Sequence, residues 1–195
     1  MTHKEEILKL ANENHGVLFS EEVSKLKLSK SALHQLVKEE ALFPVQRGIY
    51  VTEDGYVDDY VLVQHRFKGG VFSHETALYL LGYSDRIPQE MTMSFKHGRS
   101  TRGIREEMVV PVMVSHHWDL GIKEVVKNGL PIRVYNIERT LVDLLKPRYH
   151  GDLEQVVPAL KQYAKSQEKD VNRLLSYAKV FGVERTIQHY IGVLL

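Results

Sequence analysis

The sequence predicts an α+β protein made of two domains, and three patterns along the chain support this. Residues 20–51 contain two short helical segments followed by two short extended runs. Residues 91–135 contain apolar runs with the period of β-strands, separated by glycine-containing turns. From residue 137 onward the apolar positions return to helical spacing. A small helix-and-hairpin domain, a mixed α/β domain with a mainly antiparallel sheet and a helical C-terminal end are therefore expected.

Composition sets limits on the class of protein. A chain of 195 residues with 43% apolar content can bury ordinary globular cores. It has no cysteine, which excludes disulfides, thiolate metal sites and cysteine nucleophiles. No apolar run approaches the roughly 18 residues of a membrane span, and the first residues lack a secretion signal. We expect a cytoplasmic protein without a membrane partner.

The N-terminal segment predicts a helix from His3 to Asn14, with apolar residues on one side and Gly16 as its stop. A short edge strand is expected at 17–19 and a second helix from Ser20 to about Lys27. Ser29 can cap a third helix only a few residues later, so the connection is as tight as a helix-turn-helix requires.

The third helix has two different faces. Leu33, Leu36 and Val37 fall together on the side that would pack inward. The opposite side presents polar or cationic residues, as does the face of a helix that enters the DNA major groove. These candidate DNA-binding residues are Lys30, Ser31, His34, Gln35 and Lys38. An ordinary solvated helix face is the alternative interpretation.

A predicted hairpin follows, with extended runs at 42–47 and 49–52 joined at Arg47-Gly48. Glycine there can take the positive φ of a tight tip. Gln46 and Arg47 would lie at this tip, where arginine can reach a phosphate or the minor groove, unless it is an ordinary hairpin arginine. Helices and hairpin together predict a winged helix-turn-helix over residues 1–54. The Asp54-Gly55 turn predicts the boundary with a second domain over 55–195.

The second domain begins with a predicted helix over 57–67 and another after Ser73, its expected cap. Alternating residues predict a half-buried strand over 91–95. Residues 109–114 are apolar on both faces, which predicts a central strand. A hairpin over 122–135 is expected to turn at Asn128-Gly129, the dipeptide best suited to a type I′ turn.

The C-terminal part is predicted to be helical throughout. Asn136 caps a helix that Pro147 stops, and Asp152 and Asp170 cap later helices. Pro158 either kinks its helix or marks the restart of the chain as a new one.

Charge is distributed unevenly, although the net charge is only +1. Through Phe95 the chain has 10 Lys and Arg against 14 Asp and Glu, a net of −4; from Lys96 onward it has 16 against 11, a net of +5. The loop 96–105 contains four cations and no acid, which is typical of phosphate contacts but also of a disordered connection. This asymmetry is consistent with a C-terminal surface for an anionic partner, and a solvated basic surface is the alternative interpretation.

Three segments in this order resemble the AbiEi antitoxin family of type IV toxin-antitoxin systems. They are FPVQRGIYV, SHETALYLLGYSDRIPQEMTMSF and GLPIRVYNIERTLVDLLKPR, and the resemblance spans nearly the whole chain. It implies a winged helix-turn-helix that represses its own operon by binding operator DNA. It also implies antitoxin activity against a cognate nucleotidyltransferase-like toxin without a stable complex.

The resemblance also implies a role for a basic surface of the second domain, in DNA contact or antitoxicity. Its candidate residues are Lys96, Arg99, Arg102, Arg105, Lys161, Lys165 and Arg173. The chain departs from a strongly basic DNA-binding domain, because residues 1–48 contain seven cations and seven acids. Operator affinity is therefore expected to depend on the second domain as well.

Enzymatic function is not expected. No His-Glu-x-x-His, no metal-spaced cluster and no phosphate-binding Gly-Lys-Ser/Thr loop occurs, so neither a metal nor a cofactor is predicted. His74-Glu75 and Asp58-Asp59 could suggest acid-base chemistry, but a helix cap and a solvated face explain them better. The histidines are interpreted as surface residues or as satisfied core residues. The alternative function is a protein-interaction module or a general transcriptional regulator with a winged helix and no toxin partner.

Overall fold

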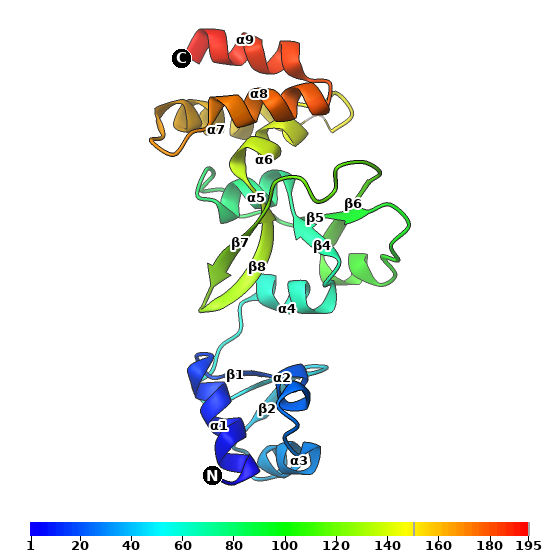
Figure 1. The fold of residues 1–195 in the computed structure, drawn as a ribbon, viewed down its shortest axis with the longest axis vertical. Helices are drawn as coiled ribbons and strands as arrows, with labels where there is room; N and C mark the ends of the chain where they lie inside the picture. The colour runs from blue at the N-terminus through cyan, green and yellow to red at the C-terminus, as the bar shows by residue number, and fades with distance from the viewer. Residues whose placement is uncertain (150, 195) are drawn as a thin grey trace. The chain divides into compact units, whose positions relative to one another are not determined.

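The computed structural model describes residues 1–149 and 151–194 and divides into two compact units (Figure 1). Unit 1 comprises Met1–Arg66 with Val126–Ile132, and unit 2 comprises Phe67–Val125 with Arg133–Leu195. The units divide after Arg66, whereas the sequence predicts a boundary between residues 54 and 55. No helix in the described part of the chain is long and apolar enough to cross a membrane.

Unit 1 contains four helices and a small antiparallel sheet. In chain order its elements are α1 (His3–Glu13), β1 (Val17–Phe19), α2 (Ser20–Lys25), α3 (Lys30–Lys38), β2 (Phe43–Gln46), β3 (Ile49–Val51) and α4 (Asp59–Arg66). The strand order is β1-β3-β2, with both pairings antiparallel. The three helices and the hairpin therefore lie where the sequence predicts them.

Local chemistry accounts for these elements. Thr2 and Glu5 form a reciprocal capping box at the start of α1, which satisfies two backbone N–H groups. Gly16 ends the connection after α1 with a φ of +82°. The core of unit 1 is formed by apolar side chains from α1, β1, α2 and α3. Its buried residues are Ile7, Ala11, Leu18, Val23, Leu28, Leu33, Leu36 and Leu42.

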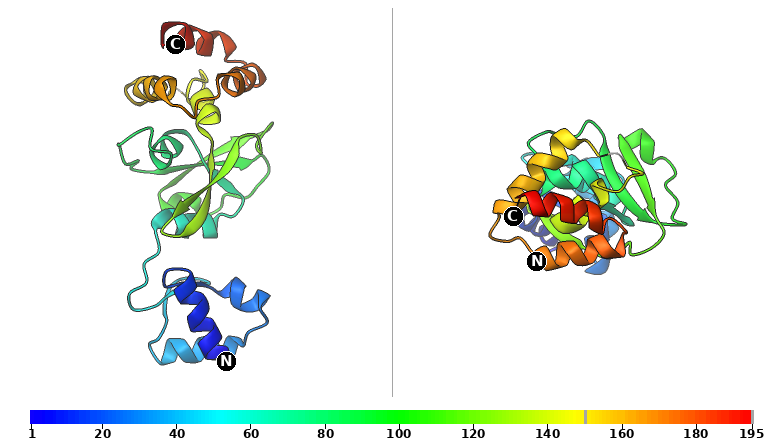
Figure 2. Two further views of the ribbon diagram at one scale, coloured as in Figure 1. Left: turned by 60° about the vertical axis from the view of Figure 1, so that its left-hand side comes forward. Right: turned by 90° about the horizontal axis from the view of Figure 1, so that it is seen from above.

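Unit 2 is built on a five-stranded sheet with the order β6-β5-β4-β8-β7 (Figures 1 and 2). Its elements up to the last strand are β4 (Gly70–Phe72), α5 (His74–Leu80), β5 (Met91–Lys96), η1 (Ile104–Glu107), β6 (Val109–Val114), β7 (Ile122–Lys127) and β8 (Leu130–Tyr135). The part of β7 and β8 within Val126–Ile132 is grouped with unit 1. The hairpin turn lies where the sequence predicts it, with positive φ at Asn128 and Gly129 (47° and 79°). Alternate residues of β8 are buried: Leu130, Ile132 and Val134.

Two expectations about this sheet are wrong. The sheet is mixed and not mainly antiparallel, since β5 pairs parallel with β6 and β4 pairs parallel with β8. The connection from 97 to 108, which includes η1, is long enough to bring the chain back and start β6 in the direction of β5. β6 is also an edge strand and not a central one, and four of its six residues are only partly buried. Its apolar composition indicated burial on both faces, but strand order depends on distant pairings that composition does not encode.

Helices complete unit 2 beyond the sheet. They are α6 (Ile137–Leu144), α7 (Leu153–Lys165), α8 (Val171–Val180) and α9 (Glu184–Leu194). The predicted caps are confirmed, because Asn136, Asp152 and Asp170 each accept a backbone N–H with the side chain. Pro158 lies inside a continuous α7, so it does not mark the restart of a helix. A core shared by α5 and the C-terminal helices holds this layer together.

Candidate nucleic-acid interface and a buried charged cluster

The third helix presents the polar face that the sequence predicts. Ser29 caps α3, its Oγ accepting the Ala32 N–H at 3.3 Å, and Leu33 and Leu36 are buried beneath the helix. The side chains predicted to face DNA are all exposed: Lys30, Ser31, His34, Gln35 and Lys38. Burial of one face therefore leaves the candidate set on the other.

Acidic residues lie outside this helix. Glu39 is the C-terminal cap of α3, and its carboxylate accepts from Lys4 Nζ at 2.7 Å. Glu40 follows with a φ of +56°, beyond the helical residues. Within its own bounds α3 thus carries two lysines and no acid. Its charge favours an anionic partner.

The hairpin supplies the other two candidate residues of unit 1. Arg47 is exposed and Gln46 is partly buried, next to the Gly48 turn. Gly48 has a φ of +83°, and a Cβ there would lie 3.0 Å from Ser20 Oγ. The conformation therefore favours glycine at this tip, and the Ser20 hydroxyl leaves little room for a Cβ.

The basic residues of unit 2 do not belong to one local segment. Lys96, the last residue of β5, is exposed, and so are Arg99, Arg102 and Arg105 on the connection that follows. A second group lies on the helical layer: Lys161 and Lys165 on α7 and Arg173 on α8 (Figure 1).

Ion pairs and a missed arginine change this candidate set. Arg173 pairs with Asp170 at 3.0 Å and with Glu138 at 3.8 Å, so its charge is largely used within the protein. The sequence interpretation missed Arg133 on β8, which donates to the Gly70 carbonyl at 3.2 Å. Burial lowers the pKa of Arg133, Arg99 lowers it further, and Glu124 opposes them. Arg99 and Arg133 therefore influence each other electrostatically.

A buried charged cluster in unit 2 was not predicted. Ser73 and His74 follow β4, which is the middle strand of the five. The first residue of α5 is therefore next to the centre of the sheet. His74, the first residue of α5, is 4% exposed, so of the two interpretations of the histidines it is a core residue and not a surface residue. Ser73 lies at the expected cap position, but its Oγ contacts His74 Nδ1 at 3.0 Å and Ser94 Oγ at 2.9 Å instead of capping the helix.

Arg139 on α6 is the centre of this cluster and is fully buried. Its Nε donates to Asp143 Oδ2 at 2.8 Å. Its Nη1 donates to the carbonyl oxygens of His117 and Leu120, at 2.7 and 2.8 Å. The guanidinium also lies over the rings of Tyr135 and Phe181, 4.3 and 4.1 Å from their centroids. One side chain thus joins α6 to the loop before β7, to β8 and to the end of α8.

Burial changes the protonation of several groups in this cluster. It lowers the pKa of His74 from 6.5 to about 4, against the opposing effect of Asp143. It also lowers the pKa of Lys146, whose Nζ donates to Asp143 Oδ1. Burial raises the pKa of Tyr135. His74 is therefore neutral at pH 7.

Gly121 provides a test of how tightly the chain packs beside Arg139. Its φ is +84°, and a Cβ would lie 2.8 Å from Arg139 Cβ. Gly98 has the same type of backbone, with a φ of +86°, but nothing within 4 Å of its Cβ position. We expect Gly98→Ala to lower the free energy of unfolding by about 1 kcal/mol through backbone strain alone, and Gly121→Ala by about 1–3 kcal/mol more through overpacking. Urea unfolding of both variants measures the difference, and equal values would contradict the packing described here.

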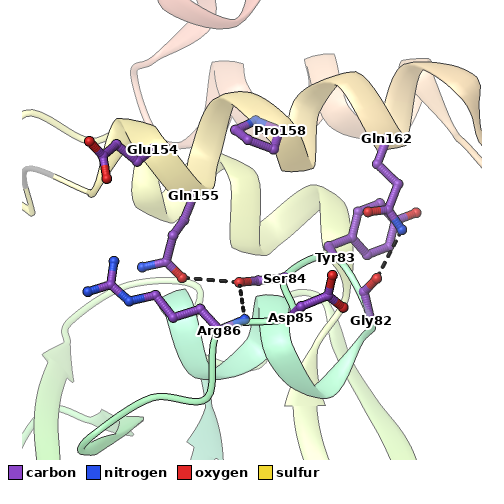
Figure 3. A pocket seen from close by; sticks show the side chains of 9 residues that line it. All are labelled: Gly82, Tyr83, Ser84, Asp85, Arg86, Glu154, Gln155, Pro158 and Gln162. Carbon is purple, nitrogen blue, oxygen red and sulfur yellow. Dashed lines mark hydrogen bonds between the residues drawn. The ribbon is translucent and has the colours of Figure 1, made fainter.

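A separate polar pocket of about 380 Å³ lies between the α5–β5 loop and α7 (Figure 3). Ser84 Oγ donates to Gln155 Oε1 at 3.2 Å, and Gln162 Nε2 donates to the Gly82 carbonyl at 2.9 Å. At its edge Arg86 pairs with Asp152 at 3.1 Å. These contacts attach the loop to α7.

Metal-binding geometry is absent from the described residues, where no three His, Asp or Glu side chains are grouped to hold an ion. No protein-family model matches the sequence, and neither does any curated protein. Among solved structures the chain is similar to the Rv2827c protein from Mycobacterium tuberculosis, with a TM-score of 0.57 and 16% identity over 89% of this chain and 69% of that one. At this identity the similarity shows a common α+β fold.

Proposed function

We propose that the chain is a DNA-binding autorepressor and the antitoxin of a type IV toxin-antitoxin operon. In this proposal it binds operator DNA upstream of its own operon. It also counteracts a nucleotidyltransferase-like toxin without forming a stable complex, and it acts in the cytoplasm with neither catalysis nor a cofactor. The observation that carries the DNA-binding part is α3, which exposes five polar or cationic residues and no acid within its bounds.

The arrangement of unit 1 supports a winged helix-turn-helix. The element order α1-β1-α2-α3-β2-β3 and the strand order β1-β3-β2 are typical of that motif. In it α3 would enter the major groove, and the β2–β3 hairpin would be the wing. Arg47 would then reach the phosphate backbone or the minor groove.

The antitoxin part rests on the sequence resemblance to the AbiEi family. The exposed cations of the 96–105 connection give it a plausible surface for an anionic partner. We assign them either to additional operator contact, since residues 1–48 are electrically balanced, or to antitoxicity. Arg173 is the weakest member of the basic set, because its two ion pairs hold it to Asp170 and Glu138.

An electrophoretic shift assay tests the DNA-binding part. The full chain is mixed with the DNA upstream of its own gene and with a scrambled duplex of equal length, at low salt. We expect retardation of the upstream DNA at protein concentrations that leave the scrambled duplex free. Equal retardation of both duplexes, or of neither, would exclude a sequence-specific repressor.

Replacing Arg47 by Ala tests the role of the hairpin tip. If Arg47 neutralises one phosphate, the slope of log affinity against log salt concentration should become shallower by about 0.9, with weaker binding. Lys9→Ala is the matched control, because Lys9 lies on α1 and its charge pairs with Glu13. Fluorescence anisotropy over a salt series gives both slopes, and an unchanged slope for Arg47→Ala would place its side chain in solvent.

Co-expression with the neighbouring toxin gene tests the antitoxin part. We expect the full chain to restore growth, while an affinity-tagged copy recovers no toxin. If growth is restored only when the toxin co-purifies in stoichiometric amounts, the proteins neutralise each other by complex formation and the type IV assignment is wrong.

A further inference from the structure

The buried cluster around His74 has more positive than negative charge. Four charged groups act electrostatically on His74: the acid Asp143 and the cations Lys146, Arg139 and Arg148. Arg139 is fully buried, and the Lys146 side chain is only 16% exposed. Uncompensated charge is expensive to keep away from water, so this arrangement favours an additional negative group.

The same cluster has hydrogen-bond donors without acceptors. Both oxygens of Asp143 are engaged, Oδ2 by Arg139 Nε and Oδ1 by Lys146 Nζ. Arg139 Nη2 and His74 Nε2 are buried and have no hydrogen-bond partner among the described residues. When the Ser73 hydroxyl donates to His74 Nδ1, Nε2 carries the hydrogen and is a donor too. What these groups lack is a hydrogen-bond acceptor.

The backbone at His74 is strained. Its φ is +54°, in the left-handed region that histidine adopts only occasionally. The His74 ring lies 4.3 Å from the Tyr149 ring, centroid to centroid, and its Nδ1 contacts the Ser73 hydroxyl. These two contacts fix the position of the ring. Strain of this kind persists where surrounding contacts enforce it, and it is concentrated at binding sites.

The cluster also reaches the surface. Arg148 is exposed and donates to the Tyr149 hydroxyl at 2.7 Å, and Tyr149 itself is partly buried. The Lys146 side chain also retains some exposure. Two of the cations that act on His74 are therefore accessible to solvent, Arg148 more than Lys146.

We propose that His74, Arg139 and Lys146 form a binding site for a compact oxyanion, specifically a phosphate group, which is either free phosphate or the phosphate of a nucleotide. The oxyanion accepts hydrogen bonds from Arg139 Nη2, His74 Nε2 and Lys146 Nζ and neutralises the excess charge. A buried water is the competing occupant. It would accept from the same donors but leave the charge unbalanced.

Thermal unfolding of the full chain tests this site. Sodium phosphate and adenosine 5′-monophosphate are each titrated against sodium chloride of equal ionic strength. We expect a saturable rise in Tm of about 4 °C at ten times Kd. If sodium phosphate gives a saturable rise in Tm, the site binds the free ion. If only the nucleotide gives it, the site binds the phosphate group of a larger ligand.

Two variants separate binding at the cluster from a general salt effect. Lys146→Met should abolish the saturable rise, and Lys123→Met, at an exposed position of β7, should retain it. Titration of the wild-type chain followed by the imidazole NMR signals provides a measurement that needs no variant, since phosphate should shift the His74 signals. A Tm that follows chloride for both ligands, with unchanged His74 signals, would overturn the proposal and leave water as the occupant.

Discussion

Arg139→Met is expected to lower the free energy of unfolding of unit 2 by about 3–5 kcal/mol, the usual cost of breaking a buried ion pair. Arg139 is fully buried and Asp143 is 2% exposed, so water cannot replace the lost contacts. The substitution leaves the carboxylate with Lys146 alone. It also removes the donor of the His117 and Leu120 carbonyl oxygens, while the apolar length of the side chain is approximately retained.

The fluorescence of Trp118, the only tryptophan, measures this effect in urea. Trp118 Nε1 donates to the Ser94 carbonyl at 3.2 Å, so the indole reports on the same part of the sheet. Lys9→Ala is the matched comparison in unit 1, because Lys9 and Glu13 have the same i,i+4 spacing as Arg139 and Asp143. Its effect is the change in the free energy of unfolding of unit 1. The side chains of Lys9 and Glu13 are 61% and 59% exposed, so this pair should contribute less than about 1 kcal/mol.

The result distinguishes a structural centre from a dispensable contact. A loss below about 1 kcal/mol for Arg139→Met would mean that the cluster relaxes or admits water when the guanidinium is removed. Adding Asp143→Leu to Arg139→Met removes the unpaired carboxylate. The double variant should therefore lose less stability than the sum of the two single variants, which the corresponding double-mutant cycle measures.

The candidate DNA-binding residues could be found from the sequence because the signals for them are local. Helical spacing in α3, the Ser29 cap and the Gly48 turn each depend on a few neighbouring residues, and all are present in the structure. The exposure of Lys30 and Lys38 follows directly from the burial of Leu33 and Leu36 on the opposite face. Local consistency of this kind makes the prediction of elements reliable.

The arrangement of unit 2 could not be found in this way. The parallel pairing of β5 with β6 and the edge position of β6 depend on how the chain returns after residue 96. His74 and Asp143 are far apart in sequence, and each alone looks like an ordinary polar residue at a helix start or on a helix. The one local sign in the sequence is the spacing of Arg139 and Asp143 on α6: they lie four residues apart, so they share a face and can pair. No local pattern indicated that this face is buried.

Acid is expected to destabilise the protein through His74 by about 3 kcal/mol between pH 6.5 and pH 4. Burial lowers the pKa of His74 in the folded protein to about 4, whereas the unfolded chain has the ordinary value of 6.5. The difference of 2.5 pKa units corresponds to about 3 kcal/mol at 1.36 kcal/mol per unit. His74 is 4% exposed, so solvent screening removes little of this energy.

The sign follows from proton binding. Between pH 6.5 and pH 4 the unfolded chain binds the His74 proton and the folded protein does not, so the free energy of unfolding rises with pH. The free energy of unfolding has its full value above about pH 6.5 and falls as the pH approaches 4. Below pH 4 His74 causes no further loss, because it is protonated in both states. Protonation would add a cation beside Arg139, Lys146 and Arg148, which only Asp143 opposes.

His74→Asn isolates this contribution, because asparagine does not titrate and tolerates a positive φ. Urea unfolding of both proteins in phosphate-free buffer between pH 4 and 7 should give curves that diverge below pH 6.5, with the wild type losing about 3 kcal/mol more than the variant. Carboxylates shared by the two proteins cancel in this difference. Parallel curves would mean that the His74 imidazole is solvated or paired when protonated, and the cluster would then tolerate positive charge instead of requiring an anion.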